Sequence, residues 1–149
     1  MKKLSSVFYM WIGLGLSVLA VLMMFVPFAS FDGGTTVAAR HLFWSEGTEG
    51  GAWPAFIGYM LILAGGIALG IIALPFIQIS TKVEKAVLFT SGAFILVGAV
   101  LSCLITVEYS AMGGTFYGNF DYFLPGFYLT LFFSLGALAM DAIALILDW

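Results

Sequence analysis

Four long apolar stretches are the feature of this 149-residue sequence that most limits how the chain can fold. We place them at residues 8–29, 54–78, 83–107 and 126–147. Each is long enough to cross a bilayer as a helix, which takes roughly 20 residues. Since 62% of all residues are hydrophobic and only 9% are charged, little of the chain falls outside these stretches. The sequence predicts an all-α integral membrane protein, with a single membrane domain over residues 1–149 that forms a four-helix antiparallel bundle.

The basic residues predict how the bundle lies in the membrane. Lysine and arginine gather in the cytoplasmic loops of membrane proteins. Arg40 stands alone on one predicted side, whereas the other side has four lysines, namely Lys2, Lys3, Lys82 and Lys85. We therefore expect a multi-pass protein of the cell membrane with both termini cytoplasmic.

The two predicted outer loops, residues 30–53 and 108–125, differ in composition from the spans. They contain clusters of turn-forming residues, such as "SEGTEGG" in the first loop, and aromatic residues, such as "TFYGNFDYF" in the second. Glycine and small polar residues in clusters are typical of turns. Two hypotheses stay open for these loops. Short strands pair above the bundle, with "TVAARHLFW" as one extended segment, or the aromatic side chains lie on the membrane surface.

A weak internal repeat relates the two halves of the chain. A shift of 71 residues aligns span two with span four, and a shift of 79 aligns span one with span three. The identities include Pro54/Pro125, Gly65/Gly136, Ala73/Ala144, Gly13/Gly92 and Ala20/Ala99. This pattern predicts two tandem helical hairpins related by an axis along the membrane normal. The alternative is chance similarity, because membrane helices use few residue types.

Small residues predict which helix faces meet. Apolar burial hardly drives association in lipid, so small side chains that let backbones approach mark the contacts. In the fourth span, small and polar residues recur every three or four positions and therefore share one face. The predicted packing residues of the four spans are Gly13, Ser17, Gly66, Gly70, Gly92, Ser134 and Ala137.

Asp141 is the one charged residue well inside the fourth apolar stretch. A carboxylate is costly in lipid and usually faces protein or water. Asp141 lies six residues before Leu147, about 9 Å from the predicted inner end at 1.5 Å per residue. With Ser134 and Thr130 on the same face, it forms a candidate intramembrane polar site. Three interpretations stay open: a structural polar contact, a pair with a cation on another subunit, or a proton or cation site in a small oligomeric transporter.

Catalytic chemistry has no evident basis in this sequence. We find no nucleophile–base pair and no phosphate-binding glycine-rich loop, so we predict no enzyme, no catalytic residue and no cofactor. His41, Glu46 and Glu49 do not have the spacing of a metal site, and we expect no metal. With a net charge of −3 and no basic cluster, nucleic acid is not an expected partner.

Four spans with a longer first outer loop and both ends inside resemble the topology of claudin-type tetraspan proteins. A claudin-type first loop carries a cysteine pair and a tryptophan-led motif, whereas this loop contains "HLFW" and no cysteine. The resemblance is therefore one of architecture. We expect a non-enzymatic accessory subunit or self-assembling scaffold that contacts lipids and other subunits, or copies of itself, through its helices and outer loops. The alternative is a small oligomeric transporter or channel that uses Asp141.

Overall fold

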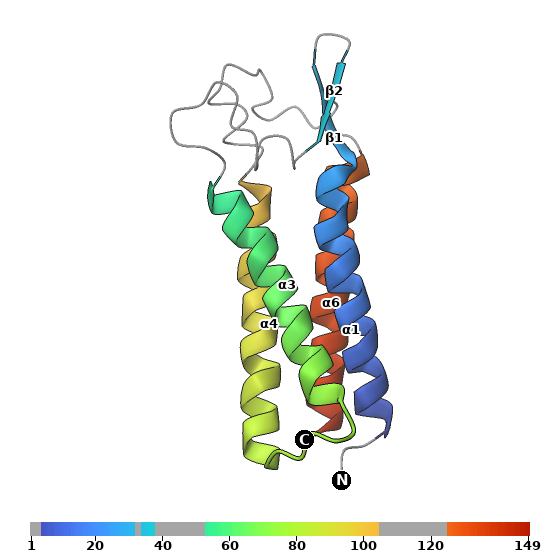
Figure 1. Ribbon diagram of the computed structural model, residues 1–149, viewed down its shortest axis with the longest axis vertical. Coiled ribbons are helices and arrows are strands. Elements are labelled where there is room, and N and C mark those ends of the chain that lie inside the picture. The colour runs from blue at the N-terminus through green and yellow to red at the C-terminus, as the bar shows by residue number, and fades with distance from the viewer. Residues whose placement is uncertain (1–3, 32–33, 38–52, 105–124) are drawn as a thin grey trace.

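Four long helices and one small hairpin make up the described part of the chain, which in this computed structural model is residues 4–31, 34–37, 53–104 and 125–149 (Figure 1). All four helices are long and apolar enough to cross a membrane, which suggests a multi-pass membrane protein. The elements are α1 (Leu4–Leu22), continued by the single 3-10 turn η1 (Met23–Phe25), then the strands β1 (Pro27–Phe31) and β2 (Gly34–Val37), and α3 (Trp53–Ala73), α4 (Thr81–Cys103) and α6 (Pro125–Leu147).

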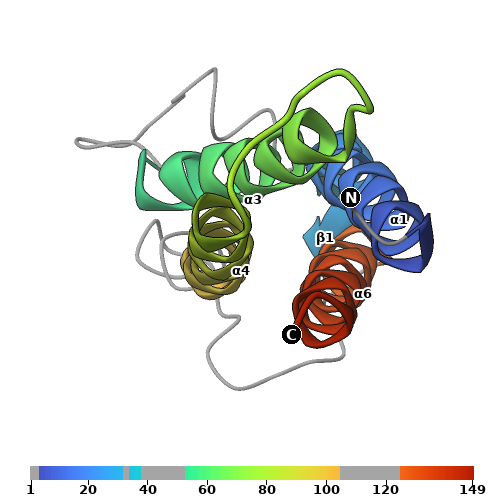
Figure 2. The ribbon, with the colours of Figure 1, turned by 90° about the horizontal axis from the view of Figure 1, so that it is seen from below.

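The helices form an antiparallel bundle in which each helix packs against two neighbours. Around the bundle the order is α1, α3, α4, α6, so α1 and α4 lie on one diagonal and α3 and α6 on the other (Figure 2). The predicted four-helix antiparallel bundle is confirmed. Leu4, Trp149 and the α3–α4 link lie at one end, here called the terminal end, and β1 and β2 lie at the other, the hairpin end (Figure 1).

Local sequence signals determine where the helices start and stop. Pro54 and Pro125 lie in the first turns of α3 and α6, where a missing backbone N–H costs nothing and the fixed φ suits a helix. Ser80 precedes α4, and its hydroxyl accepts a hydrogen bond from the Val83 backbone N–H at 3.4 Å. The span predicted over residues 54–78 ends as a helix at Ala73, five residues early, because Pro75 disfavours the helical conformation in the residue before it.

The first helical span, Leu4–Phe25, starts and ends four residues earlier than the predicted 8–29, and Pro27 is the reason for the earlier end. The apolar pattern continues to Ala29, but α1 ends at Leu22 and Val26 is extended, with φ −89° and ψ 140°. Proline disfavours the helical conformation in the residue before it, so the chain leaves the helix here. It continues into the antiparallel pair β1–β2, in which Ser30 pairs with Thr35. Strand pairing thus occurs within the first loop, while most of "TVAARHLFW" and residues 108–124 of the second loop lie outside the described residues.

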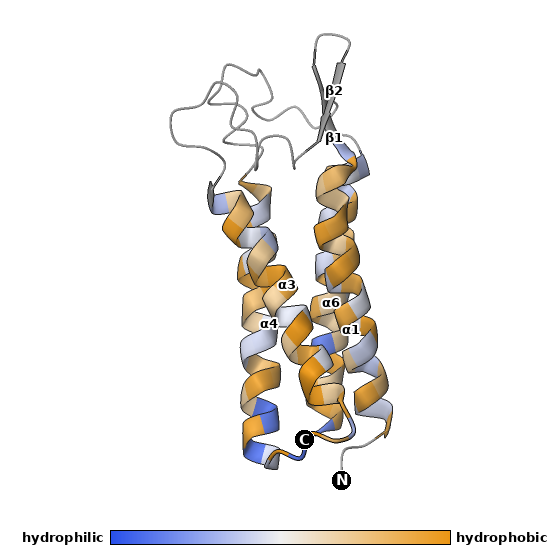
Figure 3. Cartoon of the chain, in the orientation of Figure 1, coloured by the Kyte–Doolittle hydropathy of each residue, from blue (hydrophilic) through white to orange (hydrophobic). Residues whose placement is uncertain are grey.

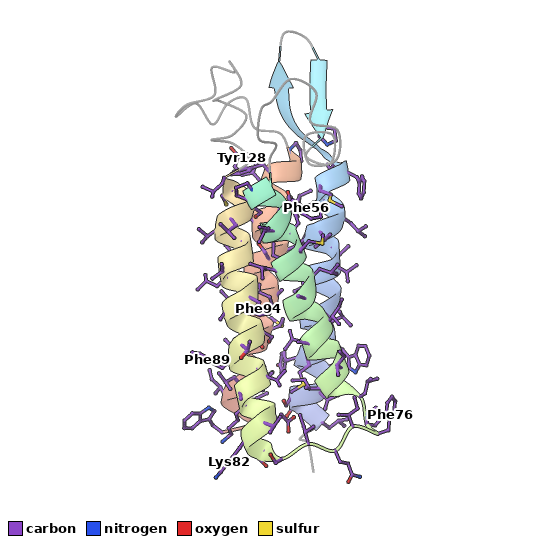
Figure 4. All side chains as sticks on the ribbon, turned by 60° about the vertical axis from the view of Figure 1, so that its left-hand side comes forward. Phe56, Phe76, Lys82, Phe89, Phe94 and Tyr128 are labelled. Atoms are coloured by element: carbon purple, nitrogen blue, oxygen red, sulfur yellow. The ribbon has the colours of Figure 1, made fainter. Side chains whose placement is uncertain are left out.

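The interior contains two apolar clusters, one in each half of the bundle. The cluster near the hairpin end is formed by Ala20, Val21, Met24, Ala55, Tyr59 and Ile62. The cluster near the terminal end draws on all four helices and is formed by Met10, Leu69, Ile72, Ala73, Leu88, Ile95, Ala137 and Ala144. Apolar residues also cover the outside of the helices, and hydrophilic ones gather at the terminal end of α4 (Figure 3). Phe89 and Phe94 extend outward from α4, toward where lipid would lie (Figure 4).

Glycines allow the helix backbones of α3 and α4 to touch. A Cβ built on Gly58 would lie 2.7 Å from the Gly98 carbonyl oxygen, and one built on Gly98 would lie 2.6 Å from the Gly58 carbonyl oxygen. No side chain fits at either position, because the obstructing atoms belong to the backbone. Close backbone approach through small residues is the usual basis of helix association in membranes.

Candidate functional site

Asp141 is buried in the apolar interior of the terminal half of the bundle. It is 3% exposed, and Ala137 and Ala144, about one turn away on either side along α6, are fully buried. Both alanines belong to the cluster to which Met10, Leu69 and Leu88 also contribute from the other three helices. The side chain is buried in protein, as predicted, on the same helix face as two alanines of this apolar cluster.

One hydroxyl group from the neighbouring helix α4 binds this carboxyl group. Ser91 is 1% exposed, and its Oγ lies 2.8 Å from Asp141 Oδ1. The same Oγ lies 3.0 Å from the Leu88 carbonyl oxygen, one turn earlier on α4. The next residue, Gly92, leaves the space that the other carboxyl oxygen fills, since a Cβ there would overlap Asp141 Oδ2. Ser91 and Gly92 together form the hydrogen-bonding and steric complement of Asp141.

The two predicted companions of Asp141 have other partners. The Ser134 hydroxyl donates to the Thr130 carbonyl oxygen at 2.7 Å, and the Thr130 hydroxyl donates to the Gly126 carbonyl oxygen at 2.8 Å. Ser134 lies seven residues from Asp141, about 10 Å along the helix axis. Thr130 also shares a side-chain hydrogen bond with Tyr59 of α3, near the hairpin end. The structure therefore does not join these hydroxyls to the carboxyl group.

The hydroxyl that does bind Asp141 is one that the sequence analysis did not single out. Ser91 stands ten residues after the start of α4, and Asp141 six residues before the end of α6. In antiparallel helices these positions lie at depths that differ by about 6 Å at most, roughly one turn. A search for polar residues at similar depth on adjacent spans could therefore have identified Ser91 as the partner of Asp141. The order of helices around the bundle, which the sequence leaves open, was needed to use it.

The predicted packing residues all lie on buried faces. Gly13 of α1 faces Leu69 of α3 and the backbone of Ala137 in α6. Ser17 fills the space left by Gly66, while its hydroxyl donates to the Gly13 carbonyl oxygen at 2.9 Å. The remaining members of the predicted set are Gly70, which faces Leu14, Gly92, which faces Asp141, and Ser134, which is fully buried.

The α1–α3 contact contains an apolar counterpart of the Asp141 site. A Cβ on Gly70 would lie 2.7 Å from Leu14 Cδ2, so the Leu14 side chain occupies the space beside that glycine. A shift of 71 carries Gly70 to Asp141, and a shift of 78 carries Leu14 to Gly92. The same point of contact thus holds leucine against glycine on one side of the bundle and aspartate against glycine on the other.

Burial supports a shift of 78 between α1 and α4, one less than the sequence identities suggested. The buried positions of α1 include Ser6, Met10, Gly13, Ser17, Ala20 and Val21. Each has a buried counterpart 78 residues later, at Glu84, Leu88, Ser91, Ile95, Gly98 and Ala99. Identities depend on residue type, whereas burial depends on which face meets a neighbour, so burial gives the register. That the halves arose by duplication stays a prediction.

Charged residues of α4 and α6 gather at the terminal end, about two helical turns from the level of Asp141. The Lys85 ammonium group lies over the Trp149 ring, 4.8 Å from its centroid, in a cation–π contact. Glu84 is 7% exposed, and Asp148 is partly buried. Each carboxylate is seven residues, or about 10 Å, from the Ser91–Asp141 level along its own helix.

Within the described residues, no group of three or more His, Cys, Asp or Glu side chains is placed to hold a metal ion. His41, Glu46 and Glu49 lie outside those residues. Comparison with protein-family models, with curated proteins and with solved structures gives no significant match.

Proposed function

We propose that the protein is a non-enzymatic membrane scaffold that assembles with copies of itself through the outward face of α1. The observation that supports this proposal is the environment of Gly15. Nine of the ten glycines in the described helices have an atom of a neighbouring element within 4 Å of the position that a Cβ would take. Gly15 has none, and it faces outward.

A glycine on a lipid-facing surface has no intramolecular reason to be there. It lowers helix stability by about 1 kcal/mol relative to alanine. The other outward residues near it on α1 are large, namely Trp11, Val18, Leu19 and Leu22. Gly15 is therefore a notch in an otherwise bulky face, and small residues of this kind let a second helix approach closely. A second copy brings the same notch to the contact, as a two-fold interface requires.

Cross-linking tests the proposal directly. Gly15→Cys, in a Cys103→Ala background, should form a disulfide-linked dimer in lipid under mild oxidation, because a two-fold α1–α1 contact brings the two residues together. Ala64→Cys, on the outward face of α3, is the matched control and should stay monomeric. Equal dimer yields from both positions would show random collision and refute the proposal. Cross-linking of Gly15→Cys to a different protein in native membranes would instead indicate an accessory subunit.

The proposed orientation has both termini and the α3–α4 link in the cytoplasm of a cell-membrane protein. Lys82 and Lys85 lie at the terminal end, and lysines favour the cytoplasmic side. The proposed scaffold therefore presents the β1–β2 hairpin and the outer loops to the exterior, where they are available for contacts.

The second candidate function is a small oligomeric transporter or channel that uses Asp141. The observation that favours it is a buried carboxyl group held between two helices in a mostly apolar interior. Polar residues in such positions often mark ion pathways. Purified protein in liposomes should show no proton or cation flux above background if the scaffold proposal holds. A reproducible flux that Asp141→Asn abolishes would make transport the better account.

A further inference from the structure

The hydrogen-bonding geometry at Asp141 involves three oxygen atoms in a row. Ser91 Oγ lies between the Leu88 carbonyl oxygen, at 3.0 Å, and Asp141 Oδ1, at 2.8 Å. A serine hydroxyl has one proton to donate and can accept through its lone pairs. If Asp141 is ionised, both neighbours of Ser91 Oγ are acceptors, and they compete for a single proton.

A second proton satisfies every atom in this row. If Asp141 is a neutral carboxylic acid, its own O–H donates to Ser91 Oγ. The Ser91 hydroxyl is then free to donate to the Leu88 carbonyl oxygen. Two contacts are thus matched by two protons, and no buried acceptor competes. We propose that Asp141 is a proton-binding site of the membrane domain, which holds the side chain as a neutral carboxylic acid through Ser91.

The surroundings favour the neutral form. Ala137, Ala144, Leu88, Leu69 and Met10 belong to the apolar cluster around this level of the bundle. Transfer of an isolated carboxylate into such an environment is costly, and a neutral acid avoids that cost. A proton also fits the site better than a metal cation, because oxygen-binding cations take several oxygen ligands. Here the Leu88 carbonyl oxygen already accepts a hydrogen bond.

The ionisable groups nearest to Asp141 do not offset its charge. On α4 these are Glu84, a further acid, and Lys85, whose ammonium group lies over the Trp149 ring. On α6 the nearest is Asp148, and on α1 it is Tyr9. The nearest ionisable residue of α3 is Tyr59, near the hairpin end. No cationic side chain in these helices is thus placed to stabilise a carboxylate at this depth.

The fold itself does not demand an acid here, as the Leu14–Gly70 contact shows. At the position in the α1–α3 interface that corresponds to Asp141 and Gly92, the contact is formed by a leucine side chain against a glycine, without a carboxyl group. The double variant Gly92→Leu/Asp141→Gly transfers that pairing to α4 and α6. It provides a variant in which a leucine–glycine contact replaces the carboxyl group of the proposed site.

Infrared spectroscopy in lipid tests the proposal. At neutral pH the parent should show the C=O stretching band of a protonated carboxylic acid. Asp141→Asn and Gly92→Leu/Asp141→Gly should both lack it. Carboxylate bands that disappear on the Asp141→Asn substitution, with no loss of an acid band, would show that the side chain is ionised and overturn the proposal. Loss of the acid band when sodium replaces choline in the buffer would also overturn it, because the site would then take a cation.

Isotope labelling keeps the test decisive if a variant does not fold. Carboxyl-¹³C aspartate introduced into the parent shifts the bands of aspartate and leaves those of glutamate, including Glu84, unchanged. An acid band at neutral pH that shifts with this label, resists exchange of the aqueous solvent for D₂O and persists in Asp148→Asn supports a buried neutral Asp141. Its absence contradicts the proposal. The result does not depend on self-association, so the Gly15 proposal can stand or fall separately.

Discussion

Adding one methyl group at different glycines should change the stability of the bundle in opposite directions. Gly98→Ala places a Cβ 2.6 Å from the Gly58 carbonyl oxygen and 2.9 Å from the Ile62 backbone nitrogen. The first distance is about 0.7 Å shorter than the ~3.3 Å at which a carbon normally contacts a carbonyl oxygen. Both obstructing atoms belong to the α3 backbone, so no side-chain rotation can relieve the overlap and the two helices must separate.

The expected magnitude follows from two opposing terms. Overpacking of this kind costs up to about 3 kcal/mol, and replacing glycine by alanine within a helix returns about 1 kcal/mol. Gly98→Ala should therefore lower the free energy of unfolding by about 2 kcal/mol. Gly15→Ala meets no atom within 4 Å and should raise it by up to about 1 kcal/mol. A Cβ in Gly136→Ala would lie 3.2 Å from the flexible end of the Leu16 side chain. The free energy of unfolding of this variant should therefore lie between those of Gly98→Ala and Gly15→Ala.

Unfolding of the purified variants by a denaturing detergent, in dilute mixed micelles that keep the chain monomeric, gives these free energies. The order of stability should be Gly15→Ala, then Gly136→Ala, then Gly98→Ala. A Gly98→Ala variant as stable as Gly15→Ala would refute the account, because it would mean that the α3 and α4 backbones do not touch at this point.

Four further outcomes are expected. Ser91→Ala removes an interhelical hydrogen bond, and such bonds in membranes contribute about 0.6 and at most about 1.7 kcal/mol. The free energy of unfolding in mixed micelles should fall by an amount in that range. An unchanged free energy of unfolding would show that this hydrogen bond does not stabilise the bundle. Asp141→Asn should retain the fold by circular dichroism, since an amide can still bond to Ser91, and an unfolded variant would show that the acid itself is required. Trp149→Ala removes the contact with Lys85, and a stability loss well above about 1 kcal/mol would exceed what an exposed cation–π pair supplies. In intact cells, an impermeant thiol reagent should label Glu49→Cys and spare Lys85→Cys, and the reverse pattern would invert the proposed orientation.

The sequence predicted the helices well because their signal is local. Long apolar runs identify spans whatever the neighbours are, and the four helices lie where hydropathy indicates. The end of α1 was misjudged because hydropathy reads Phe28 and Ala29 as continuing the span. A conformational rule, the restriction that Pro27 places on Val26, overrides that signal. Giving Pro27 priority over hydropathy would have predicted the earlier end of this span.

The candidate site was predicted only in part, because its other half lies on a different helix. The burial of Asp141 follows from the small-residue periodicity of α6 alone. Its partner depends on which helix lies beside α6 and how that helix is rotated, and these depend on contacts distant in sequence. Thr130 and Ser134 share the face of Asp141, but a helical hydroxyl readily bonds to its own backbone one turn earlier. A shared face therefore did not imply a shared site.

The central claim, self-assembly through the outward face of α1, is tested most directly by the mass of the particle released from its own membrane. Native mass spectrometry of the parent should give a multiple of the 16.0 kDa chain. Gly15→Leu, which fills the notch without touching the interior, should weaken association at least tenfold, or about 1.4 kcal/mol, and release the single 16.0 kDa chain. Ala64→Leu, on the outward face of α3, should leave the assembly intact. A parent that is a single chain at every concentration, or a Gly15→Leu variant that assembles like the parent, would contradict the account.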